Sequence, residues 1–215
     1  MPVDLAALAH PSHTAVLTME LQRGVIGDLA TIPALAAEVA SGGMIANTTR
    51  LIDAARRCDV RVVHCTAEFR ADLAGSAANC PMLAIMMRNP GHLVAGSAES
   101  EVIPELGRDP RDLHSPRSHG VSPFTATSLD VTLRHLGVTT VVATGVSVNL
   151  GILGLAIEAV NLGYFVVLPT DCVAGVPTQY AADVVDHTLA LLATRTTADE
   201  LAAHWEHAVS APRHS

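Results

Sequence analysis

Ionisable side chains stand at the ends of two apolar runs. The run Thr14–Glu20 finishes on a carboxylate, and the run Val60–Thr66 holds His64 near its end. A carboxylate in such a position can move protons as a general acid or base. The structural alternative for Glu20 is a helix-capping or salt-bridged carboxylate, and for His64 it is a hydrogen-bonded core residue. Gln22 follows directly and could pair with Glu20.

A second segment, Thr144–Gly151 (TGVSVNLG), combines a tight turn with the start of a helix. Free backbone N–H groups and the helix dipole suit such a turn to an anion or a developing oxyanion. The turn also approaches the Gly-x-Ser-x-Gly elbow of serine hydrolases, although Asn149 replaces the second glycine. Ser147 is therefore one candidate nucleophile, and Cys65 is another.

The four cysteines and eleven histidines form no metal-binding motif. The sequence contains no C-x-x-C pair, no H-x-x-x-H and no H-E-x-x-H, so we expect neither a metal ion nor a cofactor. A disulfide framework is also not expected at this cysteine density. The pattern favours buried, reduced cysteines that pack as small hydrophobic side chains.

The composition limits the classes of partner. The 215 residues carry a net charge of −8, with 49% hydrophobic and 16% charged residues. An acidic chain with scattered basic residues is not expected to bind nucleic acid. Its apolar runs are too short to span a membrane, and its start lacks a secretory signal pattern, so we expect a cytoplasmic protein. The low charged fraction predicts a homodimer or a larger homo-oligomer.

Strand-like runs alternate with helical patterns along the chain, which predicts a parallel sheet in a single domain spanning residues 1–215, with its core at about 14–197. Strands are predicted at residues 14–20, 60–66, 112–117, 138–144, 164–168 and 194–197. Helices are predicted near residues 47–58, 127–136, 150–162, 178–192 and 199–207, with a short one beginning at Pro33. Glu68–Pro110 is weakly periodic, which is typical of a functional segment or an interface arm. Ligands are expected beyond the carboxyl ends of the strands, where the winding reverses.

Three stretches together resemble a known family. They are TAVLTMELQ, SPFTATSLDVTLRHLGVTTVVATGVSVNLGI and AIEAVNLGYFVVLPTDCVAG, and they resemble the isochorismatase-like (cysteine) hydrolases from about Thr14 to Thr197. The resemblance implies an α/β fold of three layers, α/β/α, around a doubly wound six-stranded parallel sheet ordered 3-2-1-4-5-6. Strands 1 and 4 would then flank the switch point, so that Glu20 faces the Gly145–Gly151 turn.

The catalytic positions of the family differ here. Amidases of the family use an Asp, a Lys and a Cys. In this chain the Asp position holds Glu20 and the Cys position holds Gly151. The Lys position falls near Ser118, with Arg117 and His119 on either side. The isochorismatase branch also has a glycine at the third position and works without a covalent thioester. The resemblance therefore implies that Glu20 is the general acid or base, assisted by Arg117 or His119. The non-prolyl cis peptide of the family would fall between Val146 and Ser147.

The predicted function is hydrolysis of a C–N, ester C–O or enol-ether bond in a small molecule without a cysteine nucleophile. The catalytic residues are predicted to be Glu20, Arg117 and His119. Residues predicted to contact substrate are Gln22, His64, Phe124, Val146, Ser147, Asn149 and Gly151. The alternatives are a hydrolase with Ser147 or Cys65 as nucleophile, and a catalytically idle binding or scaffold protein.

Overall fold

Six strands form an all-parallel sheet in the computed structural model, which describes residues 4–89 and 91–210. The strands are β1 (Thr14–Met19), β2 (Arg61–Ala67), β3 (Leu113–Arg117), β4 (Thr140–Gly145), β5 (Phe165–Pro169) and β6 (Thr194–Thr196). Their order across the sheet is β3-β2-β1-β4-β5-β6, which confirms the predicted topology. The predicted strand limits differ from these by one or two residues.

The two central strands explain the apolar runs of the sequence. All six residues of β1 and all six of β4 are buried. Helices cover both faces of the sheet, so the side chains on both faces of these strands are buried. Their sequences therefore lack the alternation of polar and apolar residues that a half-exposed strand shows. β1 pairs in parallel with β2 on one side and with β4 on the other. The winding direction of the chain reverses between β1 and β4, which makes their carboxyl ends the switch point.

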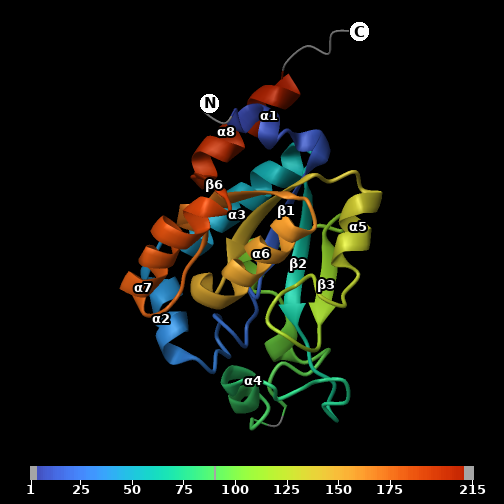
Figure 1. The fold of residues 1–215 in the computed structure, drawn as a ribbon, viewed down its shortest axis with the longest axis vertical. Helices are drawn as coiled ribbons and strands as arrows, with labels where there is room; N and C mark the ends of the chain where they lie inside the picture. The colour runs from blue at the N-terminus through green and yellow to red at the C-terminus, as the bar shows by residue number, and fades with distance from the viewer. Residues whose placement is uncertain (1–3, 90, 211–215) are drawn as a thin grey trace.

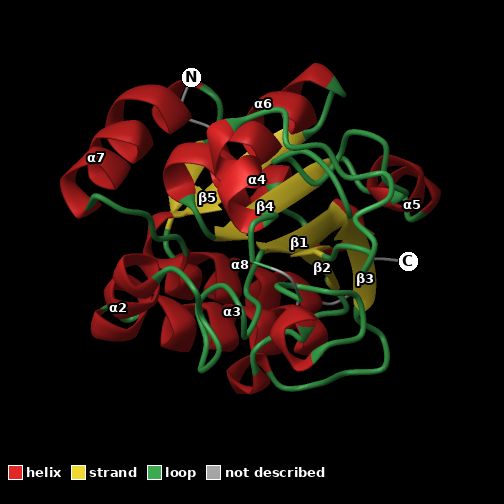
Figure 2. Ribbon diagram, turned by 90° about the horizontal axis from the view of Figure 1, so that it is seen from below, coloured by secondary structure: helices red, strands yellow, loops and turns green. Residues whose placement is uncertain are grey.

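Helices form a layer on each face of the sheet (Figure 2). One layer contains α2 (Pro33–Ser41), α3 (Met44–Arg57) and α8 (Ala198–Ser210). The other contains α5 (Leu129–His135), α6 (Leu153–Asn161) and α7 (Thr178–Asp183). Each layer closes its own cluster of buried apolar side chains against the sheet. The first cluster includes Trp205 and the second Leu155, both of which are fully buried.

Local sequence signals account for several helix ends. Pro33 occupies the first turn of α2, where its missing N–H and fixed φ fit a helix start. Gly137 and Gly163 follow α5 and α6 with φ of 71° and 88°, the left-handed conformation that ends many helices. The stretch predicted as a helix over 150–162 differs, because α6 is preceded by a π-helical turn at Val148–Ile152. The stretch 178–192 is likewise divided, with α7 followed by a π-helical turn and a 3₁₀ turn.

The segment Glu68–Pro110 lies at the carboxyl ends of the strands. In Figure 1 the arrowheads of β2 and β3 point toward α4 (Pro81–Met86) and the loops around it. Two 3₁₀ turns, Ala98–Ser100 and Pro104–Leu106, also belong to this segment. α1 (Leu5–Leu8) and α8 lie at the opposite end of the molecule. Among the described residues, none of the helices has the length and apolar character that crossing a bilayer requires.

Candidate functional site

The ends of β1 and β4 are in direct backbone contact. Met19 is the register partner of Gly145, and the Val146 N–H donates to the Met19 carbonyl over 3.0 Å. A Cβ atom on Gly145 would lie 2.2 Å from the Met19 carbonyl oxygen, and the φ of Gly145 is 109°. A side chain at this position would therefore collide with the strand. This glycine lets the turn after β4 lie against Met19, directly before the residue that follows β1.

That residue is Glu20, and its backbone is also unusual. Its φ is 53°, in the left-handed region that residues with a Cβ rarely adopt. A non-glycine residue in this region costs on the order of 1–3 kcal/mol and persists where its surroundings hold it. One such restraint is the Glu20 N–H, which donates to the Cys65 carbonyl on β2 over 2.9 Å. The bend turns the chain out of β1 at the switch point.

Glu20 forms an ion pair with Arg117, the last residue of β3. The Arg117 Nη2 donates to the Glu20 Oε1, and the two side chains are 4% and 18% exposed, respectively. Arg117 Nε also donates to the Gly120 carbonyl over 3.4 Å. Its Nη1 is buried and has no hydrogen-bond partner among the described residues. The site thus contains a carboxylate, its counter-charge and one unused N–H donor group.

A small cavity of about 70 Å³ adjoins this ion pair. Its polar lining residues are Glu20, Arg117, Ser147 and His92. Its other lining residues are Gly24, Val25, Ile32, Leu35, Met82, Met86, Val121, Leu150 and Gly151. Four of the predicted site residues, Glu20, Arg117, Ser147 and Gly151, therefore line one cavity. The wall opposite the sheet comes largely from the loop after β1 and from α4.

The turn between β4 and α6 contributes the floor of the cavity. The Val146–Ser147 peptide bond is cis. The Ser147 hydroxyl donates to the Asn149 Oδ1 over 2.6 Å and has no hydrogen bond to a histidine or a carboxylate among the described residues. A serine nucleophile needs an adjacent base, so Ser147 lacks the partner that would activate it. Gly151 is buried, and a Cβ there would lie 2.9 Å from the Val146 carbonyl oxygen.

Cys65, the other candidate nucleophile, lies within the core on β2. Its side chain belongs to the apolar cluster that α5 and α6 cover, and the residue is 1% exposed. Burial raises the pKa of its thiol to about 12. Because the thiolate is the nucleophilic form, a thiol with this pKa is unreactive near neutral pH. The structure thus supports the interpretation of Cys65 as a packed core residue.

Three other predicted residues make structural contacts away from the cavity. The Gln22 side-chain amide donates to the carbonyls of Ala67 and Ser100 and accepts from the Ala67 N–H, so its hydrogen bonds hold the loop after β1. Phe124 is buried and stacks on Tyr164 with ring centroids 5.8 Å apart. His119 lies 3.2 Å from the Thr125 carbonyl through its Nε2 and does not line the cavity. Val146 and Asn149 also lie outside the cavity lining.

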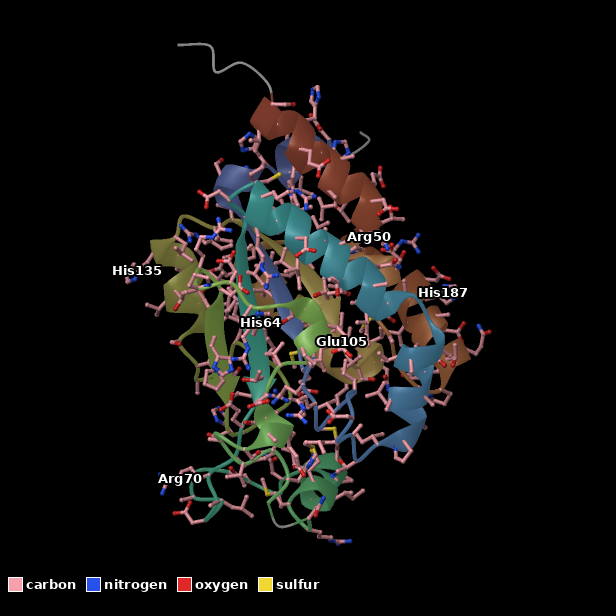
Figure 3. The ribbon with its side chains drawn as sticks, turned by 180° about the vertical axis from the view of Figure 1, so that it is seen from behind. Arg50, His64, Arg70, Glu105, His135 and His187 are labelled. Carbon is pink, nitrogen blue, oxygen red and sulfur yellow. The ribbon has the colours of Figure 1, made fainter. Side chains whose placement is uncertain are left out.

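His64 belongs to a different, larger hollow of about 980 Å³. Figure 3 views the face on which it lies, with His64 on β2 and Glu105 both labelled. His64 Nδ1 is 2.8 Å from the Thr18 hydroxyl, and its Nε2 is 3.4 Å from Asp112. Asp112 is in turn bound by Arg56 at 2.6 Å. The polar groups of His64, Asp112 and Arg56 are thus already paired within the protein. We therefore place the candidate site at the smaller cavity.

His92, which is not among the predicted site residues, also lines the Glu20 cavity, to which the segment Glu68–Pro110 brings it. Its ring is 4% exposed. Nδ1 lies 3.2 Å from Glu99 Oε2, and Nε2 lies 3.3 Å from the Thr31 hydroxyl. No motif marks His92, because its partners come from distant positions. Across the described residues, no group of three or more His, Cys, Asp or Glu side chains is arranged to hold a metal ion.

Comparisons with known proteins identify the family of this chain. The isochorismatase domain model matches residues 14–200. The chain is 28% identical over 173 residues to a ureidoacrylate amidohydrolase of Rhizobium rhizogenes, covering 75% of this chain and 70% of that protein. The structure of an isochorismatase family protein from Burkholderia thailandensis is 27% identical, with a TM-score of 0.74 over 92% of this chain and 97% of that chain.

The structure of an N-carbamoylsarcosine amidase from Thermoplasma acidophilum is 24% identical, with a TM-score of 0.68, and covers 87% of this chain and 97% of that chain. This likeness concerns the fold. The domain match spans most of the 215 residues, and these include all six strands of the sheet. The chain is a hydrolase of the isochorismatase family.

Proposed function

We propose that this protein hydrolyses a C–N, ester C–O or enol-ether bond of a small molecule without a covalent intermediate, with Glu20 as the general acid and base. The observation that carries the proposal is the buried Glu20–Arg117 pair at the wall of the switch-point cavity. The amidohydrolase relative supports the choice of a hydrolytic reaction. The turn at Ser147 and Gly151 faces the same cavity and supplies backbone next to the reacting atoms.

For an amide or ester the reaction needs only water and these residues. The Glu20 carboxylate takes a proton from a water molecule while the water oxygen bonds to the carbonyl carbon. The resulting tetrahedral intermediate carries its negative charge on the former carbonyl oxygen. That intermediate then expels the amine or alcohol, to which Glu20 returns the proton. Arg117 binds Glu20 in its ionised form, which is the form that can accept the first proton.

The placement of the candidate nucleophiles favours this route over a covalent one. Ser147 is bonded to an amide oxygen rather than to a base, and Cys65 is buried with its thiol pKa raised to about 12. The remaining alternative is an idle binding protein with the same fold. Turnover distinguishes the two, because an enzyme releases product whereas a binding protein returns its ligand unchanged.

The test is a screen of amides, carbamates, esters and enol ethers at pH 5–9, followed by Glu20→Gln. This variant keeps the side-chain shape and removes proton transfer, which carries a factor of roughly 10²–10⁴ in rate. Glu20→Asp is expected to be impaired too, because its carboxylate is drawn back from the cavity. The matched control is Glu105→Gln, an exposed carboxylate outside the cavity. Activity of Glu20→Gln within threefold of wild type would contradict the mechanism.

We also propose that the protein is a homo-oligomer. Several large apolar side chains on and beside α6 are exposed, among them Ile157, Val160 and Phe165. Burial of such side chains against a second copy removes apolar surface from water. Light scattering at micromolar concentration should give at least twice the 22.4 kDa of one chain, and a monomeric mass would contradict the proposal.

A further inference from the structure

The charged groups of the Glu20 cavity already compensate one another. Arg117 is the one Lys or Arg among its described lining residues, and it pairs with Glu20. The remaining ionisable lining residue, His92, shares its Nδ1 with the carboxylate of Glu99. A substrate carboxylate would therefore have to displace Glu20 from Arg117 or lie beside it unpaired. A substrate cation would meet a carboxylate that is already bound.

Apart from Ser147, whose hydroxyl already donates to the Asn149 Oδ1 over 2.6 Å, the rest of the cavity wall is apolar. It consists of aliphatic and methionine side chains and of two glycines, namely Val25, Ile32, Leu35, Met82, Met86, Val121, Leu150, Gly24 and Gly151. Moving an ion from water into such surroundings without a counter-charge is strongly unfavourable. An uncharged molecule meets no such cost and gains from contact with the apolar wall.

The size of the cavity limits the substrate further. Its volume of about 70 Å³ is well below the several hundred Å³ typical of pockets for drug-sized ligands. A substrate enclosed here therefore has only a few non-hydrogen atoms around the bond that is cleaved.

We propose that the substrate of this cavity is a small molecule without net charge, which packs against the apolar wall beside the Glu20–Arg117 pair. This inference rests on the proposed function, because it concerns the molecule on which Glu20 acts. The chemical class comprises short neutral amides, carbamates, esters and enol ethers. Their anionic counterparts, which carry a carboxylate a few atoms from the same bond, are excluded.

The test compares matched pairs that differ by one carboxylate. The pairs are propionamide and succinamate, methyl propionate and monomethyl succinate, and ethyl vinyl ether and 3-vinyloxypropanoate, with ammonia, methanol and acetaldehyde as the products measured. We expect wild-type protein to turn over at least one neutral member with kcat/KM at least tenfold above that of its anion. Preference for the anion, or equal turnover within a pair, would overturn the proposal.

A variant tests whether the missing counter-charge is the cause. Leu150 lines the cavity and is 37% exposed, so a lysine there can place its ammonium group at the edge of the cavity. Leu150→Lys should raise the ratio of anion to neutral kcat/KM at least tenfold. Leu150→Gln, which adds polarity without charge, should leave that ratio within threefold. An unchanged ratio in Leu150→Lys would overturn the charge argument.

Ligand binding can be measured independently of turnover. The methyl resonances of Met82 and Met86 report on the cavity wall, and they should shift with the neutral probes in wild type and in Glu20→Gln. If no neutral probe shifts them, the substrate class is wrong. If neutral probes bind and react but Glu20→Gln retains turnover, the substrate class stands and the general acid/base assignment fails.

Discussion

The carboxylate of Glu20 and the guanidinium of Arg117 meet across the end of β2, the strand that lies between β1 and β3. One ion pair therefore connects the residue after the central strand to the last residue of the edge strand. Arg117 also binds the Gly120 carbonyl, so the same side chain fastens the loop that follows β3. The catalytic role proposed for Glu20 and the stability of the fold therefore depend on the same pair.

The first prediction concerns removal of one partner. Arg117→Met leaves the partly buried Glu20 carboxylate without its counter-charge and should lower the free energy of unfolding, by an amount below the roughly 3–5 kcal/mol of a fully buried ion pair because Glu20 keeps some contact with water. Urea unfolding measures this change. In the double variant Glu20→Gln/Arg117→Met the unpaired charge is gone, so part of the loss should be recovered. Equal stability of the single and double variants would show that the pair is not coupled.

The second prediction separates two histidines. His92 lines the cavity and is fixed between Glu99 and Thr31, whereas His119 binds a loop carbonyl away from the cavity. His92→Gln should lower kcat/KM at least tenfold, and His119→Gln should stay within threefold of wild type. Unfolding curves of both variants control for loss of structure. The opposite ranking would return the assisting role to His119.

The third prediction concerns alkaline pH. Burial raises the pKa of Cys65 from its ordinary value near 9 to about 12. Between these values the unfolded chain loses the thiol proton while the folded chain keeps it, so the free energy of unfolding falls as pH rises. At pH 10.5 the loss from this thiol is about 2 kcal/mol, which Cys65→Ala should abolish.

The matched control for that experiment is Val63→Ala. Val63 is buried on the same face of β2 as Cys65. Truncating either side chain costs packing energy at every pH, but only the cysteine carries a titratable group. Urea unfolding between pH 7 and 10.5 should therefore give a shallower pH dependence in Cys65→Ala and an unchanged one in Val63→Ala. Identical slopes in the three proteins would contradict the buried thiol.

The fourth prediction concerns the position at which family amidases have a cysteine. A Cβ on Gly151 would lie 2.9 Å from the Val146 carbonyl oxygen and 3.2 Å from the Met19 Cε. The backbone atom cannot move as a flexible side chain would, so Gly151→Ala and Gly151→Cys should each cost about 1–3 kcal/mol, as overpacked cores do. Thermal unfolding checks the cost. Wild-type stability in both variants would show that this turn can yield.

The sequence predicts the sheet better than it predicts the site. Buried runs such as Val138–Thr144 and the glycines after α5 and α6 are local signals that predict strands and helix ends, whereas the observed strand order is the one that the family resemblance implies. The π-helical turns before α6 and after α7 have no comparable signal, since the helical apolar pattern continues through them. Packing against the neighbouring elements decides such turns.

The site shows the same division. The strand-end position of Glu20 can be recognised from the apolar run before it, and the structure places it at the cavity with Arg117. His92 cannot be recognised in this way, because Thr31 and Glu99 become its neighbours only after the chain folds. Phe124 is the opposite case, a residue that the sequence marks as a site residue although it does not line the cavity. It is a conspicuous aromatic residue within a stretch that resembles the family, and it stacks on Tyr164 in the core.

The origin of the cavity walls has a consequence for how this enzyme can diversify. The ion pair lies at the ends of β1 and β3, whereas Met82, Met86 and His92 all come from the one continuous segment Glu68–Pro110, whose described residues form α4 and short helical turns. Replacement of this segment can reshape the space above Glu20 without altering a strand. Selection for a new substrate can therefore act on one exchangeable stretch of the gene, while the Glu20–Arg117 pair is inherited unchanged.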